Sequence, residues 1–431
     1  MLQEMIEKVY ASFAGGSRVI TDSREVREGD IFIALKGERH DGNLFAGMAI
    51  ERGARHVVTE VAGENGDRWV TVPDPLLFLQ RLARHHRRQL GLPVLGITGT
   101  NGKTTTKELC RAVLSRKFET AATRGNLNNH IGVPLTLLEM TATTRIGIVE
   151  MGANHPGEIA ALCAIAEPDY GLITNIGQAH LEGFGSRENV IRAKNELYDF
   201  IRAHGGTLFV NGADELLVRL SRGCNAVIYG GEEGLARGKA RELYPYLTCD
   251  LCLPGGCFHA RTRLVGGYNL DNVLAAVAVG LHLGVDPRDA LEAIEEYTPA
   301  NARSQLLQGK RNTIILDAYN ANPSSMNAAI THFAGMPGEN KLLVLGEMLE
   351  LGDHAAAAHD ELLARVDALG LHRVILVGQS FESIENKYTF ARRFRDTGEL
   401  AGFLRLHPVH SSLVLVKGSR GNKLEQIIEY L

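Results

Sequence analysis

A short apolar segment followed by a glycine-rich loop and a helical pattern limits the fold of this chain more than any other feature. The segment Val94–Thr106 reads Val-Leu-Gly-Ile-Thr-Gly-Thr-Asn-Gly-Lys-Thr-Thr-Thr. Gly99 and Gly102 permit backbone angles that turn successive amide N–H groups inward, and a helix starting at Lys103 adds its dipole. A strand, loop and helix in this order are typical of an α/β sheet. We interpret the segment as a phosphate-binding loop for ATP.

Each part of this loop has an expected role towards a nucleotide. Lys103 reaches the β- and γ-phosphates, and the hydroxyl of Thr104 is a ligand for Mg²⁺. The glycine spacing departs from the general pattern, because the position five residues before Gly102 is Ile97. A plain glycine turn is the alternative. The residues predicted to contact ATP here are Gly99, Thr100, Asn101, Gly102, Lys103, Thr104 and Thr105.

Short apolar runs alternate with longer amphipathic stretches along most of the chain, which predicts parallel strands joined by helices. Expected strands of a central sheet are Val94–Thr98, Ile146–Glu150, Gly171–Ile176 and Thr207–Val210. Expected helices between them include Thr104–Ser115 and Arg187–Ile201. A second set of strands follows Pro299, namely Thr313–Asp317, Lys341–Leu345, Arg373–Val377 and Ser412–Lys417.

The region before residue 84 has fewer elements, with strands expected at Asp30–Lys36 and Val57–Glu60 and a helix at Phe45–Arg52. A basic helix, Arg81–Arg88, follows and is interpreted as a solvated face or an interdomain connector. The 431 residues suffice for three domains. The predicted fold is α/β, with a small N-terminal α/β substrate domain (1–83), a central P-loop domain with a mostly parallel sheet (84–297) and a C-terminal Rossmann-like α/β domain (298–431).

Composition excludes several classes of protein. A net charge of -4 argues against a nucleic-acid binder. No apolar run approaches the roughly 18 residues that a membrane span needs, and the acidic N-terminus does not resemble a signal peptide. We therefore expect a cytoplasmic protein, and a monomer by default.

The six cysteines are sparse, but Cys249, Cys252 and Cys257 lie close to His259. These residues could be four zinc ligands. The apolar residues Leu251 and Leu253 alternate with the cysteines as in a β-hairpin, which is the interpretation that we favour.

Two polar residues stand where predicted parallel strands end. Glu150 ends one strand and His180 follows another, so both fall at the sheet edge where ligands bind in open α/β sheets. A carboxylate and a neutral imidazole there could hold a second Mg²⁺ beside the nucleotide. Lys194 lies on a predicted amphipathic helix, where the pattern alone indicates an exposed lysine.

Taken together, these motifs resemble the Mur ligases, the ATP-dependent amino-acid and peptide ligases of peptidoglycan precursor synthesis. The loop Thr98–Thr105 matches theirs, and in that family the missing early glycine is normal. The resemblance covers essentially the whole chain. Within the family it is closest to the branch that joins D-alanyl-D-alanine to a UDP-N-acetylmuramoyl tripeptide, as judged from Gly125–Pro134, Glu150–Gly157, Asp317–Pro323 and Val416–Arg420. The Asn/Asp-x-Pro-Arg/Lys signature of the preceding ligase is missing from the last domain.

The resemblance implies a role for further residues by position. Thr104 and Glu150 should bind Mg²⁺, with His180 at a second ion, and Lys194 matches a lysine that many relatives carbamylate. Residues implied near the nucleotide are Asn269 and Asn272 at the base, and Arg303 and Asp317 at the phosphates and ribose. Residues implied in substrate binding are Ser23, Arg24, Lys36 and Asp41 at the uridine diphosphate, with Asn128, Asn129, Tyr319, Asn320 and Asn322.

The reaction implied is formation of an acyl phosphate from the tripeptide carboxylate and ATP, followed by attack of the D-alanyl-D-alanine amine. The catalytic residues expected on this basis are Lys103, Glu150, His180 and Lys194. A Mur-type ligase with another substrate, such as the third-residue-adding ligase or a folylpolyglutamate synthase, is the nearest alternative. A P-loop ATPase switch and a pure binding module are alternatives from other classes.

Overall fold

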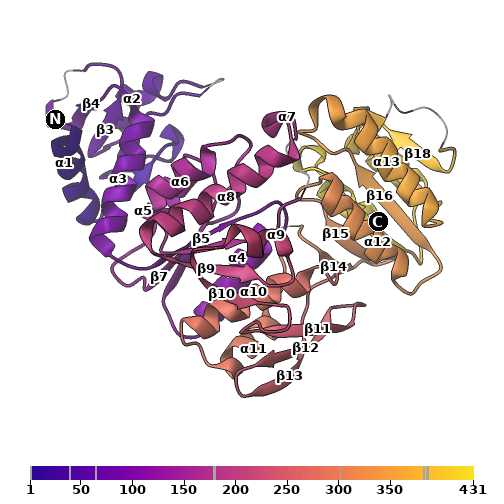
Figure 1. The fold of residues 1–431 in the computed structure, drawn as a ribbon. Helices are drawn as coiled ribbons and strands as arrows, with labels where there is room; N and C mark the ends of the chain where they lie inside the picture. Colours follow the sequence, from indigo (N-terminus) through magenta and orange to yellow (C-terminus); the bar gives the residue numbers. More distant parts are fainter. Residues whose placement is uncertain are drawn as a thin grey trace. The chain divides into compact units, whose positions relative to one another are not determined.

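The computed structural model describes residues 2–37, 40–63, 66–177, 181–300, 302–381, 384 and 388–431. The chain forms two compact units. The first unit comprises Met1–Gly96, Phe118–Gly152 and Glu158–Tyr170, and the second comprises Ile97–Lys117, Ala153–Gly157 and Gly171–Leu431. Strands and helices alternate along most of the chain, as the ribbon in Figure 1 shows.

The N-terminal part of the first unit is a four-stranded sheet in the order β1-β2-β3-β4, with parallel neighbours. Its strands are β1 (Val19–Ile20), β2 (Ile31–Ile33), β3 (His56–Thr59) and β4 (Trp69–Thr71). Its helices are α1 (Leu2–Ala14), α2 (Ala46–Glu51) and α3 (Pro75–Leu90). Strand β2 is buried throughout, and Phe32 packs with Val57 and Ala49 in its core. Both predicted strands and the predicted helix are therefore confirmed here, although β2 is shorter than the predicted Asp30–Lys36.

The central sheet has six strands in the order β10-β9-β8-β5-β7-β6. These strands are β5 (Val94–Thr98), β6 (Thr120–Ala122), β7 (Ile146–Glu150), β8 (Tyr170–Ile173), β9 (Thr207–Asn211) and β10 (Asn225–Tyr229). The helices of this region are α4 (Lys103–Leu114), α5 (Gly132–Leu138), α6 (Glu158–Ala166), α7 (Leu181–Phe184), α8 (Arg187–His204), α9 (Glu215–Leu220), α10 (Asn269–His282) and α11 (Pro287–Glu296). Strands β5 and β7 are buried at every residue. This explains why each could be predicted from an unbroken apolar run, without the alternation of polar and apolar residues that a half-exposed strand shows.

One predicted strand of this sheet ends early. The sequence predicts Gly171–Ile176 as a strand, but β8 ends at Ile173. Thr174 and Asn175 leave the sheet because their side chains bind the phosphate loop. The prediction failed because these polar residues continue an apolar run without a glycine or proline between them.

A three-stranded antiparallel sheet precedes α10, in the order β11-β12-β13. Its strands are β11 (Arg237–Glu242), β12 (Thr248–Leu253) and β13 (Gly256–Arg261). The predicted hairpin is confirmed, with Cys249, Leu251 and Leu253 on its buried face. Cys252 and Cys257 lie opposite each other and form a disulfide, which the sequence reading did not anticipate. Burial raises the pKa of the Cys249 thiol to about 12.

The C-terminal part of the second unit is a six-stranded sheet in the order β14-β15-β19-β16-β17-β18. Its strands are β14 (Gln305–Gln308), β15 (Thr313–Asp317), β16 (Lys341–Gly346), β17 (Val374–Val377), β18 (Ala391–Phe394) and β19 (Leu413–Lys417). Its helices are α12 (Pro323–Gly335), α13 (Ala355–Ala368) and α14 (Thr397–Leu406). Strands β15 to β19 are parallel to their neighbours, and only β14 runs antiparallel. The predicted Rossmann-like sheet is therefore confirmed.

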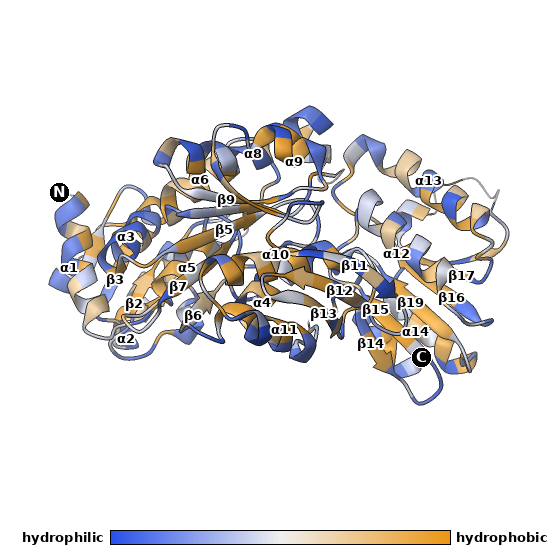
Figure 2. Cartoon of the chain, turned by 60° about the horizontal axis from the view of Figure 1, so that its bottom comes forward, coloured by the Kyte–Doolittle hydropathy of each residue, from blue (hydrophilic) through white to orange (hydrophobic). Residues whose placement is uncertain are grey.

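Short 3-10 helices make the remaining turns. They are η1 (Ser23–Glu25), η2 (Gly42–Phe45), η3 (Gly66–Arg68), η4 (Gly352–His354), η5 (Gln379–Phe381), η6 (Arg420–Asn422) and η7 (Leu424–Tyr430). Figure 2 shows hydrophobic colour along the sheet strands and mixed colour on the helices, as expected for helices that cover a sheet with one face. No helix among the described residues is long and apolar enough to cross a membrane.

The basic helix Arg81–Arg88 lies within α3, and Arg81 and Arg88 are exposed, as expected for a solvated face. Arg84 and Arg88 nevertheless both form ion pairs with Glu167, and Arg87 forms one with Asp169. These arginines tie α3 to the segment between α6 and β8 of the same unit, so the interpretation as an interdomain connector stays a prediction. The pairs lie 79 or more residues apart in sequence, and for that reason the local pattern did not reveal them.

Candidate active site

The predicted phosphate loop connects β5 to α4, and its two glycines are required by geometry. Gly99 has a φ of +141° and Gly102 a φ of +79°, both in the region that favours glycine. A Cβ atom on Gly99 would lie 2.0 Å from Oγ1 of Thr174, and one on Gly102 would lie 2.6 Å from Oδ1 of Asn272. The loop therefore excludes side chains at both positions for conformational and steric reasons.

Asn175, which follows β8, holds the loop from the neighbouring strand. Its backbone carbonyl accepts from Thr100 N at 2.9 Å, and its Oδ1 accepts from Asn101 N at 3.0 Å. Its Nδ2 donates in turn to the carbonyl of Asn101. The amides of Thr100 and Asn101 are thus engaged with Asn175, so the prediction that successive loop amides all turn inward is wrong for these two.

The anion-binding end of the loop is consequently the start of α4. Its N-cap is Gly102, which provides no side chain to cap the helix, and the first turn of a helix presents N–H groups that the helix itself does not use. Nζ of Lys103 lies over the loop, donating to the carbonyls of Gly99 (2.8 Å) and Thr100 (3.1 Å). A helix N-terminus with an adjacent ammonium group is suited to bind phosphate.

Asn269 and Asn272, implied by resemblance to approach the base, lie on α10, and the Asn272 side chain lies close to Gly102 of the loop. Asn272 accepts a hydrogen bond from Oγ1 of Thr106 and donates one to Oδ1 of Asn269. Nδ2 of Asn269 donates to the carbonyl of Val265. Both side chains are buried and tie α10 to α4, and their contact with a base stays a prediction.

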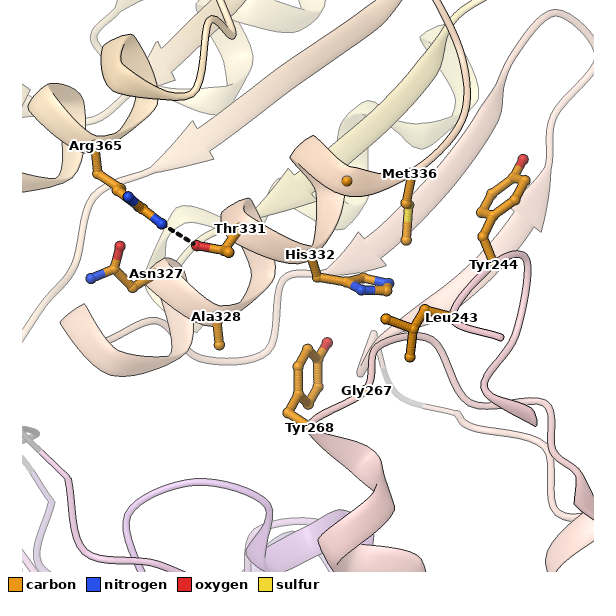
Figure 3. Close-up of a pocket in the computed structure, with 11 residues that line it drawn as sticks. Leu243, Tyr244, Gly267, Tyr268, Asn327, Ala328, Thr331, His332, Met336 and Arg365 are labelled. Carbon is orange, nitrogen blue, oxygen red and sulfur yellow. Dashed lines mark hydrogen bonds between the residues drawn. The ribbon is translucent and has the colours of Figure 1, made fainter. Parts of the chain in front are cut away.

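A cavity of about 790 Å³ opens beside Tyr268, the residue before Asn269. Tyr268 and Leu243 lie on one side of it and His332 of α12 on the other (Figure 3). The Tyr268 hydroxyl is 3.0 Å from Oγ of Ser304, and 39% of the surface of this tyrosine is exposed. The cavity walls are mostly apolar and aromatic, which is typical of small-molecule sites.

Asp317 and Lys417 meet at the carboxyl edge of the C-terminal sheet. The Lys417 ammonium is buried and lies 2.6 Å from Oδ2 of Asp317, while Oδ1 accepts from Ser304 N at 3.3 Å. Arg303 stacks on the Tyr319 ring, 3.8 Å from its centre, and Arg420 lies 5.8 Å from the same ring. Nε of Arg303 is buried and has no hydrogen-bond partner among the described residues. A buried donor of this kind fits the implied role at a phosphate.

Asn320 and Asn322, predicted to bind substrate, have defined contacts in the loop after β15. Nδ2 of Asn322 donates to Oδ1 of Asn101 at 2.8 Å, which joins this loop to the phosphate loop. Asn322 also caps α12 through Ser325. Asn320 accepts from the amide of Ala321, and its carbonyl accepts from Lys417. The structure thus brings Asn322 to the nucleotide loop.

Glu150, Asn128 and Asn129 belong to the first unit. The carboxylate of Glu150 is almost fully buried at the end of β7 and accepts from Nδ2 of Asn128 at 2.8 Å. Oδ1 of Asn129 accepts from the amides of Ile131 and Gly132 at the start of α5. Asn128 therefore orients the predicted metal ligand, a role that the sequence pattern did not indicate.

The residues predicted at the N-terminal substrate pocket lie on loops of the four-stranded sheet. Hydrogen bonds from Arg24 lower the pKa of Asp22 to about 2. Ser23 is buried, and its carbonyl accepts from Arg52. Lys36 pairs with Asp41 in an isolated bridge, with Nζ 3.9 Å from Oδ2. Their contact with a uridine diphosphate stays a prediction.

Lys194 is buried, which corrects the exposed position that the helical pattern indicated. It lies on α8 with 2% of its surface exposed, and its Nζ is 5.6 Å from the centre of the Phe184 ring. The pattern failed because α8 also packs along this face through Val190, Leu197 and Ile201. His180, the second predicted metal ligand, lies outside the described residues. In the part of the chain that the structure describes, no group of three or more His, Cys, Asp or Glu side chains is arranged to hold a metal ion.

Sequence reasoning missed two residues of this site. Asn175 locks the phosphate loop, and Lys417 neutralises Asp317. A signal existed for Lys417, because it is a charged residue that ends an apolar strand, as Asp317 does. No comparable signal marked Asn175, whose role depends on the pairing of β8 with β5.

The phosphate loop after β5, the buried Lys194 and the sheet topology define an ATP-binding α/β enzyme with a separate C-terminal Rossmann-like sheet. Residues 97–280 match the family profile described as "Mur ligase middle domain", and residues 302–420 match "Mur ligase, glutamate ligase domain". Residues 17–87 match "Mur ligase family, catalytic domain". The chain belongs to the Mur ligase family, and it is an ATP-dependent ligase of the α/β class.

Curated and solved relatives match nearly the whole chain. The chain is 35% identical to the UDP-N-acetylmuramoyl-tripeptide–D-alanyl-D-alanine ligase of Bacillus subtilis, over 96% of this chain and 92% of that protein. The structure of MurF from Acinetobacter baumannii is 34% identical, with a TM-score of 0.87 over 95% of this chain and 92% of that one. MurF ligase of Thermotoga maritima in complex with ADP is 30% identical, with a TM-score of 0.86 and 97% of both chains covered.

Proposed function

We propose that this chain adds D-alanyl-D-alanine to UDP-N-acetylmuramoyl-tripeptide at the expense of ATP, in the cytoplasm and as a monomer. The observation that carries the proposal is that relatives bearing this activity in their names match the chain over 96% of its length. The four stretches Gly125–Pro134, Glu150–Gly157, Asp317–Pro323 and Val416–Arg420 support the same branch of the family.

The carboxylate must be activated first, because an amine does not displace an oxygen from a free carboxylate. A terminal carboxylate oxygen of the tripeptide attacks the γ-phosphorus, the bond to the β,γ-bridging oxygen breaks, and ADP leaves. The D-alanyl-D-alanine amine then adds to the acyl carbon and loses a proton. Collapse of the tetrahedral intermediate expels phosphate and leaves the new peptide bond.

Two anions approach each other in the first step, so positive charge is needed around the transferring phosphoryl group. Lys103 supplies an ammonium group over the loop, and the start of α4 supplies its dipole. Asn175 and Asn272 keep the loop in position while charge moves. Arg303, with its buried Nε, extends the cationic surface from the C-terminal sheet.

Magnesium ions, when bound, neutralise charge on the phosphates. The residues that would hold them are Thr104 and Glu150, with His180 at the second ion. The Thr104 hydroxyl and the Glu150 carboxylate are hard oxygen donors of the kind Mg²⁺ prefers, and both are buried. Asn128 donates to one oxygen of Glu150 and so orients this carboxylate.

A carbamate on Lys194 is part of the proposal. Carbamylation converts the ammonium into a carboxylate, which can support a metal ion. The burial of Lys194 supports this part of the proposal, because a group that supports a metal ion has to lie inside the site and not on the solvent face of α8.

The UDP-linked tripeptide is assigned to the N-terminal sheet and the segment before α5, and the dipeptide to the C-terminal sheet. Ser23, Arg24, Lys36 and Asp41 are assigned to the uridine diphosphate. Asn128 and Asn129 are assigned to the tripeptide, and Tyr319, Asn320 and Asn322 to D-alanyl-D-alanine. The contact between Asn322 and Asn101 supports the last assignment, because it places the loop after β15 at the nucleotide loop.

The test is release of phosphate from ATP by the purified chain with a panel of acids and amines. We expect release only with UDP-N-acetylmuramoyl-tripeptide and D-alanyl-D-alanine together. Release with the UDP-linked dipeptide and a diamino acid would indicate the preceding ligase instead. Phosphate release from ATP alone, at the rate measured with both substrates present, would indicate an ATPase switch. A Lys103→Ala variant provides the background rate.

A further inference from the structure

The loops that follow β16, β17 and β19 converge on one carboxylate, that of Glu347. These three strands are neighbours in the C-terminal sheet, and Leu345 pairs with Lys417 while Gly346 pairs with Val377. Their carboxyl ends therefore share one edge, where ligands bind in open parallel sheets. Glu347 is the first residue beyond β16 at this edge.

Glu347 is held in place by neutral donors. Its Oε2 accepts from Ser380 N at 2.9 Å and from Ser380 Oγ at 2.6 Å. Gly378 lies beneath the side chain with a φ of +128°, and a Cβ there would lie 2.6 Å from the carboxyl carbon of Glu347. Buried His359 fixes the next residue by accepting a hydrogen bond from Met348 N. This carboxylate is thus built into the edge with a defined orientation.

Among the described residues, no cationic side chain forms an ion pair with Glu347, and its Oε1 has only a 3.5 Å contact, with Nδ2 of Asn422. The nearby ammonium of Lys417 is committed to Asp317. A carboxylate offers about four acceptor positions, so Oε1 keeps unused capacity.

The Asn422 amide lies beside Glu347 with its Nδ2 towards the carboxylate, while its Oδ1 is buried against Gly346 and Gly418. A Cβ on either glycine would come within 3.0 Å of Oδ1, so the two glycines let this amide pack at the sheet edge. The amide is neutral and does not balance the negative charge of Glu347. An oriented carboxylate of this kind favours a ligand with a positive charge and N–H groups.

A metal ion fits this place poorly. No group of three or more His, Cys, Asp or Glu side chains that could hold one occurs in the described part of the chain. An ammonium group needs only one carboxylate and one or two neutral acceptors. The reaction proposed above has a substrate that carries such a group.

We infer that Glu347 binds the ammonium group of the incoming dipeptide, which rests on the function proposed above. Glu347 attracts the cationic form of the amine and holds its nitrogen at the carboxyl edge of the sheet. Ser380, Gly378 and Asn422 keep the carboxylate oriented.

The test measures ADP release by the full chain as a function of D-alanyl-D-alanine concentration, at saturating ATP and UDP-linked tripeptide. Glu347→Gln keeps the shape and an acceptor for Ser380 but removes the charge. We expect its KM for the dipeptide to rise by about 10- to 100-fold, as for loss of a hydrogen bond to a charged group, with the KM for ATP within about twofold. Asp353→Asn removes an exposed carboxylate from the same segment after β16 and should leave both values unchanged.

Hydroxylamine provides the second measurement, because it is uncharged at neutral pH and traps acyl phosphates. Glu347→Gln should form the hydroxamate of the tripeptide at nearly the parent rate. A dipeptide KM within twofold of the parent, or equal loss of hydroxamate and peptide product at an unchanged KM, would overturn the inference. If the parent chain itself does not use D-alanyl-D-alanine, the proposed function falls instead, so the two failures are distinguishable.

Discussion

Nζ of Lys417 lies 2.6 Å from Oδ2 of Asp317, at the ends of two adjacent parallel strands that pair residue for residue. Both side chains are largely shielded from water, with 2% and 17% of their surfaces exposed. Removing one partner of such a pair leaves the other charge uncompensated, which typically costs about 3–5 kcal/mol. Lys417→Met should therefore lower the midpoint of thermal unfolding clearly.

The matching control uses Lys310→Met, which replaces an exposed lysine before β15 and should leave the midpoint unchanged. The double variant Asp317→Asn/Lys417→Met should be more stable than Lys417→Met alone, since no buried charge is then unpaired. If Lys417→Met unfolds at the parent temperature, the ion pair does not stabilise the sheet edge.

Gly99→Ala should abolish ATP turnover. The added Cβ would lie 2.0 Å from Oγ1 of Thr174, and the φ of +141° is unfavourable for alanine. The loop must then shift away from Asn175, which moves Lys103 as well. Steady-state ADP release is the measurement. Gly402→Ala, where a Cβ meets nothing within 4 Å, should keep full activity. Normal turnover of Gly99→Ala would contradict the packing described for the loop.

Much of the fold could be predicted because its strands are buried on both faces. Val94–Thr98, Ile146–Glu150 and Thr313–Asp317 are strands with the predicted ends, since each apolar run stops at a turn or a polar residue. The four strands β1 to β4 are too short for a period to be recognised, and β1 has only two residues. The local sequence pattern therefore predicted the longer strands of the central and C-terminal sheets better than the short strands β1 to β4.

The candidate site was predictable where a residue's role follows from its own position in the chain. Lys103 and Gly99 have such a position, directly after a strand. Lys194 does not, because its burial depends on which face of α8 packs against the sheet. Asn175 and Glu347 depend on strand order, which only the folded sheet reveals.

Lys103→Ala should reduce kcat by about 10²–10³-fold, the usual loss for one preorganised group that stabilises developing charge. Its ammonium lies over the phosphate loop and is bound to carbonyls of Gly99 and Thr100. The measurement is kcat for ADP formation, with circular dichroism to establish that the variant is folded. Activity within tenfold of the parent would remove Lys103 from phosphate transfer.

Lys194→Ala should lose most activity and regain part of it with added short carboxylates such as acetate. The rescue follows if a carbamate on this buried lysine serves as a carboxylate. Lys194→Arg keeps the positive charge but cannot be carbamylated, so it should be as inactive as Lys194→Ala without added carboxylate. Full activity of Lys194→Arg, or an inactive Lys194→Ala that no carboxylate restores, would exclude the carbamate.

His359 should make stability fall at acidic pH. Its Nε2 accepts from Met348 N and its Nδ1 lies 2.7 Å from the carbonyl of Ala355, so the folded form holds the neutral ring. Burial lowers the pKa of His359 below the ordinary 6.5, against weaker opposing effects of Ala355 and Glu347. Below about pH 6.5 the unfolded chain binds a proton that the folded chain does not, so the free energy of unfolding decreases as pH falls.

The measurement for His359 is urea unfolding of the parent and His359→Gln at pH 7.5 and 5.5. The parent should be more stable at pH 7.5, and the difference between the two proteins should narrow at pH 5.5. His56 and His86, whose pKa values are also lowered by burial, contribute equally to both proteins and cancel in the difference. A difference that stays constant with pH would show that His359 does not titrate in this range.

Transfer of a carboxylate oxygen to phosphate tests the proposed reaction most directly. The tripeptide substrate is labelled with ¹⁸O in both oxygens of its terminal carboxylate and converted with ATP and D-alanyl-D-alanine. Mass spectrometry of the released phosphate should then find one ¹⁸O in each phosphate formed, because one carboxylate oxygen leaves with the γ-phosphoryl group. Phosphate without label, formed together with peptide product, would contradict an acyl phosphate at this loop.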